Sequence, residues 1–249
     1  MLFATPGPHL EKNIAIVDNN TISDNLGSGL SFAGSEGVII RGNTISRNHD
    51  YGIAIEKPGD VVIYSNSILN NGDKGVSLDV GTIACLRDNS IRGNHGNGIV
   101  AHGRGRIKEN DIIGNLGSGM KICGPGDPFV TKNRIYSGQY PAVEVLVNAR
   151  GCVTDNEIYC EAYEKVIQDI GSTTIVEDND FLTSKVPAGN KGEPADLMDL
   201  SSLTSPRPRQ TGNAIPRGDI SHIVGKLTAT HASKANGSYR NMSRFCIIV

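Results

Sequence analysis

The sequence contains no tryptophan, only 5% aromatic residues, and no apolar run near the ~20 residues that a membrane-spanning helix requires. It also has no excess of either charge, because its formal net charge is −2. Nucleic-acid-binding proteins usually concentrate positive charge on one face, so we predict no nucleic-acid partner. The opening MLFATPGPHLEKN has neither the basic start nor the apolar stretch of a secretory signal, which predicts a cytoplasmic protein.

Glycine is abundant by contrast, with 30 residues, and asparagine recurs at a fixed interval. Eight asparagines follow one another at intervals of 23 residues, with one interval of 21: Asn20, Asn43, Asn66, Asn89, Asn110, Asn133, Asn156 and Asn179. A large apolar residue stands three positions before each of them, and another stands two positions after. A second asparagine column follows at Asn25, Asn48, Asn71, Asn94 and Asn115. Within each unit the apolar residues alternate with others, which is typical of short strands with one buried face.

A unit of this length cannot bury an apolar face by itself, so neighbouring units must stack to form a core. Three short strands per unit predict a triangular coil, with glycine and asparagine at its corners because both tolerate left-handed backbone. We therefore predict an all-β protein, a right-handed parallel β-helix (solenoid) of about eight coils at residues 13–184. Residues 185–249 are rich in proline, glycine and serine, which predicts a disordered basic tail.

The regular asparagine column has a structural and a functional interpretation. A binding site would interrupt the column, whereas a ladder of side chains, each hydrogen-bonded to the same asparagine of the next coil, would repeat it. We therefore predict that the eight asparagines form a structural ladder. Charged residues in the outward columns also predict ion pairs between neighbouring coils, in Asp18/Arg41, in Asp24/Arg47 and along Glu109, Lys132 and Asp155.

One pair of acidic residues is suited to act on a polysaccharide, as some β-helix proteins do. Asp50 and Asp73 occupy the same position in neighbouring units, beside His49 and Lys74. Glycoside hydrolysis uses two carboxyl groups roughly 5–9 Å apart. Aspartate is also typical of a solvated turn. We therefore assign no catalytic residue, and Asp50 and Asp73 are the candidates if the chain is an enzyme.

The spacing of the cysteine and histidine residues favours neither a disulfide nor a metal site. Cys85 and Cys152 occupy one column three units apart, roughly 14 Å, which is too far for a disulfide. His49 and His95 are two units apart, and no cysteine pair has the C-x-x-C spacing. We therefore predict no metal, no cofactor and free thiols, which fit a reducing compartment.

Three successive units read GRGRIKENDIIGN, GDPFVTKNRIYSGQYPAVEV and ARGCVTDNEIY. This repeat pattern resembles the β-helix region of the β-helix-bearing F-box-only proteins, which are substrate-recruiting subunits of cullin-type ubiquitin ligases. The resemblance covers about residues 13–184. It implies a protein-binding β-helix, although we recognise neither an F-box nor a zinc-binding Cys/His module in the sequence.

The sequence ends in CIIV, a cysteine followed by two aliphatic residues and a terminal residue, which is the form of a prenylation signal. We therefore predict that Cys246 carries a farnesyl or geranylgeranyl chain. One prenyl chain anchors a protein only marginally and needs a second signal. Basic residues would supply part of that signal at an anionic membrane surface: Lys226, Lys234, Arg240 and Arg244.

Together these features predict a cytosolic, non-catalytic β-helix scaffold that binds a protein partner along its side. Lipidation of Cys246 would hold it peripherally on the cytosolic face of membranes. Two alternatives remain, the substrate-binding portion of a ubiquitin-ligase adaptor and a carbohydrate-active lyase, hydrolase or epimerase that uses Asp50 and Asp73. The open coil ends also present unpaired strand edges, through which the protein could form an oligomer.

Overall fold

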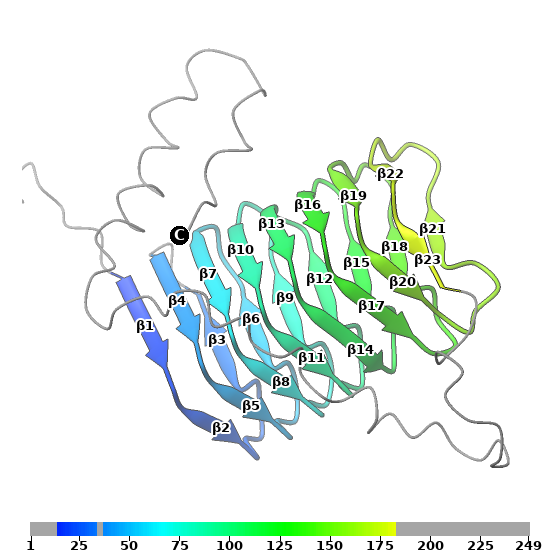
Figure 1. Ribbon diagram of the computed structural model, residues 1–249. Helices are drawn as coiled ribbons and strands as arrows, with labels where there is room; N and C mark the ends of the chain where they lie inside the picture. The colour runs from blue at the N-terminus through cyan, green and yellow to red at the C-terminus, as the bar shows by residue number, and fades with distance from the viewer. Residues whose placement is uncertain (1–13, 34–36, 183–249) are drawn as a thin grey trace, which may run out of the picture. The chain divides into compact units, whose positions relative to one another are not determined.

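The computed structural model describes residues 14–33 and 37–182, which form strands and turns without a helix. The strands run in the same direction in three sheets, which we call sheets A, B and C (Figure 1). Each coil contributes one strand to each sheet in turn. Seven coils of three strands are complete, and β22 and β23 begin an eighth.

Within each sheet, the strands follow one another along the stack in chain order. Sheet A contains β1 (Ile14–Asp18), β4 (Gly37–Arg41), β7 (Asp60–Tyr64), β10 (Ile83–Arg87), β13 (Arg104–Lys108), β16 (Asp127–Thr131), β19 (Cys152–Thr154) and β22 (Ile175–Glu177). Sheet B contains β2 (Thr21–Ser23), β5 (Thr44–Ser46), β8 (Ser67–Leu69), β11 (Ser90–Arg92), β14 (Asp111–Asn115), β17 (Arg134–Ser137), β20 (Glu157–Tyr159) and β23 (Asp180–Phe181). Sheet C contains β3 (Leu30–Phe32), β6 (Ile53–Ile55), β9 (Val76–Leu78), β12 (Ile99–Ala101), β15 (Met120–Ile122), β18 (Val143–Val145) and β21 (Val166–Gln168).

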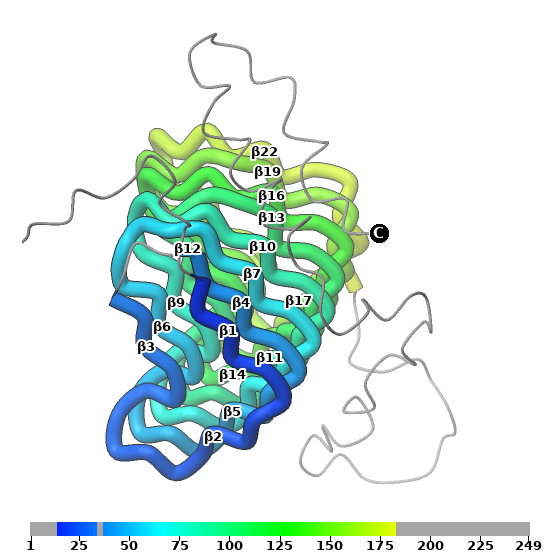
Figure 2. The backbone as a smooth tube through the Cα atoms, turned by 90° about the vertical axis from the view of Figure 1, so that its left-hand side faces the viewer, coloured from blue at the N-terminus to red at the C-terminus, as the bar shows by residue number. Residues whose placement is uncertain are grey.

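The register of the strands follows the sequence repeat. Ile40 pairs with Ile63 across a 23-residue step, and Leu86 pairs with Ile107 across the single 21-residue step. Equivalent residues of successive coils therefore form columns along the stack, as the superposed coils in Figure 2 show. The predicted fold class, an all-β parallel β-helix, is confirmed.

The core lies inside the coils, where the inward side chains of all three sheets meet. One large apolar residue from each sheet of a typical coil is completely buried, as with Ile63 of sheet A, Ile68 of sheet B and Val76 of sheet C. Burying such a side chain contributes about 1.5–3 kcal/mol relative to leaving it in water. Because every coil repeats the contribution, the fold depends on stacking and not on any single coil.

We predicted that the asparagines at the corners would have left-handed backbone. In the structure, the left-handed residues are those immediately before the ladder asparagines. Their φ angles lie between 53° and 64° at Asn19, Gly42, Ser65, Asp88, Glu109, Lys132, Asp155 and Asp178. A left-handed residue turns the chain sharply between sheets A and B. The asparagine that follows is thereby free to point its amide along the stack.

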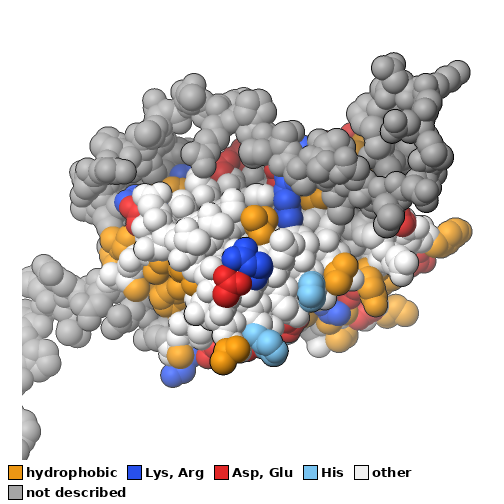
Figure 3. Space-filling view, turned by 90° about the horizontal axis from the view of Figure 1, so that it is seen from below, with side chains coloured by type: hydrophobic (Ala, Val, Ile, Leu, Met, Phe, Trp, Pro, Cys, Tyr) orange, Lys and Arg blue, Asp and Glu red, His pale blue; other side chains and the backbone are white. Residues whose placement is uncertain are grey.

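Two of the predicted ion pairs form and the third set does not. Arg41 lies 2.7 Å from Asp18, and Arg47 lies 2.8 Å from Asp24. Figure 3 shows such a contacting pair of opposite charges on the face seen from below. In the part of the chain that the structure describes, no ion pair joins the predicted column of Glu109, Lys132 and Asp155. That prediction was wrong because these residues occupy the left-handed corners, and the Glu109 carboxylate pairs with the adjacent Lys108.

The predicted tail at 185–249 and the predicted lipidation site Cys246 lie outside the described residues, as do residues 13, 34–36, 183 and 184 of the predicted β-helix. Across residues 14–33 and 37–182, no helix is long and apolar enough to cross a membrane.

Candidate functional site

The eight asparagines of the first column form a continuous chain of hydrogen bonds along the corner between sheets A and B. Each Nδ2 donates to the Oδ1 of the asparagine in the next coil, over distances of 2.9 to 3.3 Å. The Nδ2 of Asn66 also lies 3.0 Å from the carbonyl oxygens of Ile40 and Tyr64. The hydrogen-bond donors and acceptors of the buried amides are thus engaged within the fold and are not available to bind a ligand.

A second ladder, visible in the sequence only as a column, runs along the corner between sheets B and C. Its side-chain bonds are 2.8 to 2.9 Å long and join Asn25, Asn48, Asn71, Asn94 and Asn115. The residue before each of these asparagines again has a left-handed backbone, as at Asp24 and Gly93. The regular spacing of these asparagines was the signal that could have identified the second ladder.

The structure places the candidate carboxylates Asp50 and Asp73 on neighbouring coils, where the backbone N–H of Asp73 donates to the carbonyl of Asp50 (3.0 Å). Both side chains are about half exposed, and each lies 3.2 Å from its own basic neighbour, His49 or Lys74. The Lys74 ammonium also covers the ring of Tyr51 at 4.3 Å. A general acid at neutral pH usually depends on burial to hold its proton. Such burial is missing from this pair.

Burial lowers the pKa of Lys74, but hydrogen bonds with Tyr51 and Asp73 raise it by more, so the net shift is upward. Lys74 therefore stays protonated at neutral pH. Within the described ranges, no three His, Cys, Asp or Glu residues gather as metal ligands. Among the described cysteines, Cys123, Cys152 and Cys160 are free thiols.

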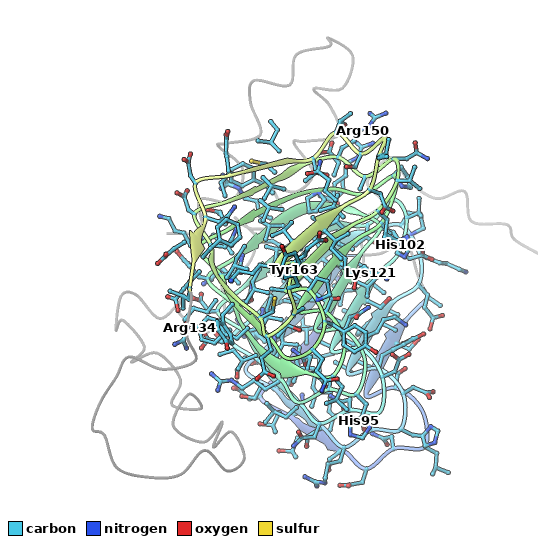
Figure 4. The ribbon with its side chains drawn as sticks, turned by 90° about the vertical axis from the view of Figure 1, so that its right-hand side faces the viewer. His95, His102, Lys121, Arg134, Arg150 and Tyr163 are labelled. Atoms are coloured by element: carbon cyan, nitrogen blue, oxygen red, sulfur yellow. The ribbon has the colours of Figure 1, made fainter. Side chains whose placement is uncertain are left out.

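A cluster of exposed apolar residues, which we did not predict from the sequence, surrounds β18 and β21 of sheet C. We call it the β18–β21 patch, and it consists of Tyr140, Val147, Tyr163, Ile167 and Ile170. Tyr163 and Ile170 are fully exposed, and the other three are between one third and just over one half exposed. Figure 4 shows Tyr163 at the end of the stack that faces the viewer. A group of exposed apolar side chains in one place is typical of an interaction surface.

Polar side chains border the patch on the same face of sheet C. Lys121, Glu144 and Ile167 are successive residues of one outward column. The Lys121 ammonium lies 2.8 Å from Glu144, whose other carboxylate oxygen accepts a hydrogen bond from the Ser118 hydroxyl. Burial raises the pKa of Glu144, but these two hydrogen bonds lower it by more, so the carboxyl is ionised at neutral pH. The patch therefore has a fixed polar rim on one side.

A second charged group lies on sheet B, where Asp111 stands between two arginines. Arg134 donates two hydrogen bonds of 2.6 Å to the Asp111 carboxylate, and Arg92 lies 3.3 Å from it. The hydrogen bonds with Asp111 raise the pKa of Arg134, whereas burial lowers that of Arg92. Because the Asp111 carboxylate faces both guanidinium groups, we interpret this triad as a link between three coils and not as an anion site.

This geometry defines a right-handed parallel β-helix with exposed apolar residues around β18 and β21, near its last coils. A family model described as a right-handed β-helix region matches residues 7–106. Among solved structures, the A-module of the mannuronan C-5 epimerase AlgE6 from Azotobacter vinelandii is similar, with a TM-score of 0.55 and 15% identity. The match covers 69% of this chain and 59% of the module. At this identity it shows a shared fold, and no curated protein matches the chain.

Proposed function

We propose that the chain is a non-catalytic scaffold that binds a protein partner along the side of the β-helix, through the β18–β21 patch. The exposure of its two tyrosines and three aliphatic residues around one strand pair is the observation that carries this proposal. Tyrosine is enriched among the residues that dominate protein-interface energies. The patch also has the polar rim that such interfaces usually show.

The stacked coils hold the patch in a fixed shape. Tyr140 and Tyr163 stand one coil apart in the column that Asp50 and Asp73 occupy on earlier coils. Neighbouring coils are about 4.8 Å apart, so the backbone positions of the two tyrosines are adjacent along the stack. A backbone that is already ordered loses little conformational entropy when its surface binds a partner.

The double substitution Tyr163→Asp with Ile170→Asp is expected to weaken partner binding by at least about thirtyfold, because two central anchors would each cost ~1–2 kcal/mol or more. Partners should be captured on the full-length protein in extracts of its native cell and quantified by mass spectrometry. Leu26→Asp is the matched control, because Leu26 is equally exposed but lies on the first coil. Equal recovery of the same partners by the double variant and the control would refute the proposal.

The resemblance to F-box-only proteins indicates one form that this role could take. In that form the patch would hold a protein destined for ubiquitin transfer, and the chain would be the substrate-binding portion of a ligase adaptor. Captured partners whose ubiquitination depends on Tyr163 would support this version.

We further propose that a prenyl chain on Cys246 tethers the scaffold to the cytosolic face of a membrane. The CIIV ending and the basic residues before it support this proposal. The scaffold could then present its partner at a membrane surface.

Cys246→Ser is expected to move most of the protein from the membrane fraction to the cytosolic fraction, because it removes the sulfur to which the lipid is attached. Fractionation of the native cell, with mass spectrometry of the C-terminal peptide, measures both location and modification. Cys152→Ser is the control, since it removes a partly exposed thiol of the β-helix. An unmodified C-terminal peptide with unchanged fractionation would refute the anchor.

A carbohydrate-active function is the second candidate, which the likeness to the epimerase module favours. Asp50 and Asp73 lie on neighbouring coils, so an extended polymer along the stack could reach both. If the protein epimerises or cleaves mannuronan, Asp50→Asn with Asp73→Asn should reduce the rate by at least about a hundredfold. Product analysis by NMR tests this, and an inactive unmutated protein would exclude the candidate for this polymer.

A further inference from the structure

Negative charge is concentrated on the last strands of the β-helix, next to the β18–β21 patch. Residues 152–182 contain eight acidic residues and one basic residue, Lys165, and six of the eight acidic side chains are exposed. The described residues before them, 14–33 and 37–151, contain twelve acidic and thirteen basic residues. Charge is therefore balanced along most of the stack and strongly negative at the end that carries the patch.

Two of these acidic side chains adjoin members of the patch. Glu164 directly follows Tyr163 and is exposed, and Asp169 directly precedes Ile170. The Asp169 carboxylate accepts a hydrogen bond of 3.2 Å from the backbone N–H of Val147, which fixes it beside the patch residue of the preceding coil. In the part of the chain that the structure describes, neither carboxylate is in an ion pair, so no contacting cation neutralises either of them.

We propose that the β18–β21 patch binds a basic segment of its partner protein, in which apolar residues stand among lysines or arginines. This inference rests on the proposed scaffold function and specifies the kind of segment that the patch takes. The apolar side chains of the segment would pack on Tyr163 and Ile170, and its cations would approach Glu164 and Asp169. Opposite charges around an apolar contact mainly add specificity and speed association.

Charge argues against two other occupants of the same surface. Two copies of this chain that met through the patch would bring the Glu164 and Asp169 carboxylates of one copy close to those of the other, and like charges across an interface are unfavourable. An acidic partner would meet the same repulsion. Glu144 adds little to it, because the Lys121 ammonium lies 2.8 Å from its carboxylate. A cationic segment is therefore the occupant that the charges at the patch favour.

Three synthetic peptides test the proposal on the full-length protein. The first has leucine and lysine on opposite faces of a helix about 20 Å long, which corresponds to about 14 residues. The second has glutamate in place of every lysine, and the third has serine in place of every leucine. We expect the leucine–lysine peptide to bind at least about tenfold more tightly than either of the others, because it alone matches both the charge and the apolar side chains. Fluorescence anisotropy of labelled peptides at low salt measures the dissociation constants.

Glu164→Gln with Asp169→Asn tests the charge without removing an apolar contact, and the asparagine keeps an oxygen that can accept the Val147 hydrogen bond. This variant is expected to bind the leucine–lysine peptide about threefold to tenfold more weakly at low salt, and the difference should shrink at high salt. Glu56→Gln with Asp79→Asn is the matched control. These exposed carboxylates occupy the position of Asp169 on coils 2 and 3, away from the patch, so binding should not change.

Equal binding of the leucine–lysine and leucine–glutamate peptides would overturn the proposal, as would equal weakening by the two carboxylate variants. Equal binding of the serine–lysine peptide would also overturn it, because the acidic side chains would then attract any cation without the patch. Self-association of the full-length protein that Tyr163→Asp with Ile170→Asp abolishes would make a second copy the occupant.

Partner capture from cell extracts separates this proposal from the scaffold function on which it rests. If Tyr163→Asp with Ile170→Asp loses its partners but the leucine–lysine peptide does not bind the unmutated protein, the scaffold function stands and the basic segment is refuted. If the same double variant keeps its partners, the scaffold function itself fails.

Discussion

Replacing Gly105 by alanine is expected to lower the free energy of unfolding by about 3–5 kcal/mol, a large part of the roughly 5–15 kcal/mol that stabilises an ordinary domain. Gly105 is the second residue of β13 and pairs with Ala84 of β10. Its φ angle is +126°, a conformation that residues with a side chain rarely adopt. An added methyl group would overlap the carbonyl oxygen of Ala84, so the two coils would have to separate.

Gly138→Ala is the matched control for this prediction. Nothing lies within 4 Å of the methyl group that it would add, and the φ angle of Gly138 is not in the left-handed region. Its effect should therefore stay within about 0.5 kcal/mol of zero. Urea unfolding of both variants, followed by far-ultraviolet circular dichroism, measures the difference. If Gly105→Ala proves as stable as Gly138→Ala, the close approach of β10 and β13 is not as described.

The inward columns were predictable from sequence because every coil repeats the same requirement. Each coil needs a large apolar residue two positions after its ladder asparagine, to pack on the equivalent residue of the preceding coil. The sequence supplies this residue in every coil, from Ile22 to Phe181. Gly105 was not predictable in the same way. It lies within the single 21-residue unit, where β13 pairs with β10 across 21 residues and not the 23 of the neighbouring pairings.

The outward surfaces were harder to predict because they do not repeat. The column that carries Asp50 and Asp73 on early coils carries Tyr140 and Tyr163 on later ones, and only the structure shows that these tyrosines, with Ile167 and Ile170, are exposed around β18 and β21.

Asn66→Ala is expected to destabilise the protein by about 2–4 kcal/mol, because it breaks a buried ladder at its centre. The Oδ1 of Asn66 accepts hydrogen bonds from both the backbone N–H and the Nδ2 of Asn43, each 3.0 Å long. Its Nδ2 lies 3.0 Å from the Oδ1 of Asn89 and from two backbone carbonyls. Truncation leaves the buried backbone N–H of Asn43 without an acceptor and removes the link between the Asn43 and Asn89 side chains, at a depth that water does not reach.

Asn20→Ala tests whether burial is the cause, because Asn20 is the exposed first member of the same ladder. Water can satisfy the groups that this truncation releases, so its cost should remain below about 1 kcal/mol.

Asn66→Asp tests the acceptor role of the Asn66 side chain separately from its donor role. The carboxylate keeps an acceptor for Asn43 but is buried, and burial raises the pKa of the introduced carboxyl above its unfolded value. The loss of stability should therefore grow as pH rises from about 4 to 7, whereas that of Asn66→Ala should not change with pH. Denaturant unfolding at several pH values distinguishes Asn66→Asp from Asn66→Ala. If Asn20→Ala and Asn66→Ala lower the free energy of unfolding equally, the ladder does not stabilise the stack through buried amides.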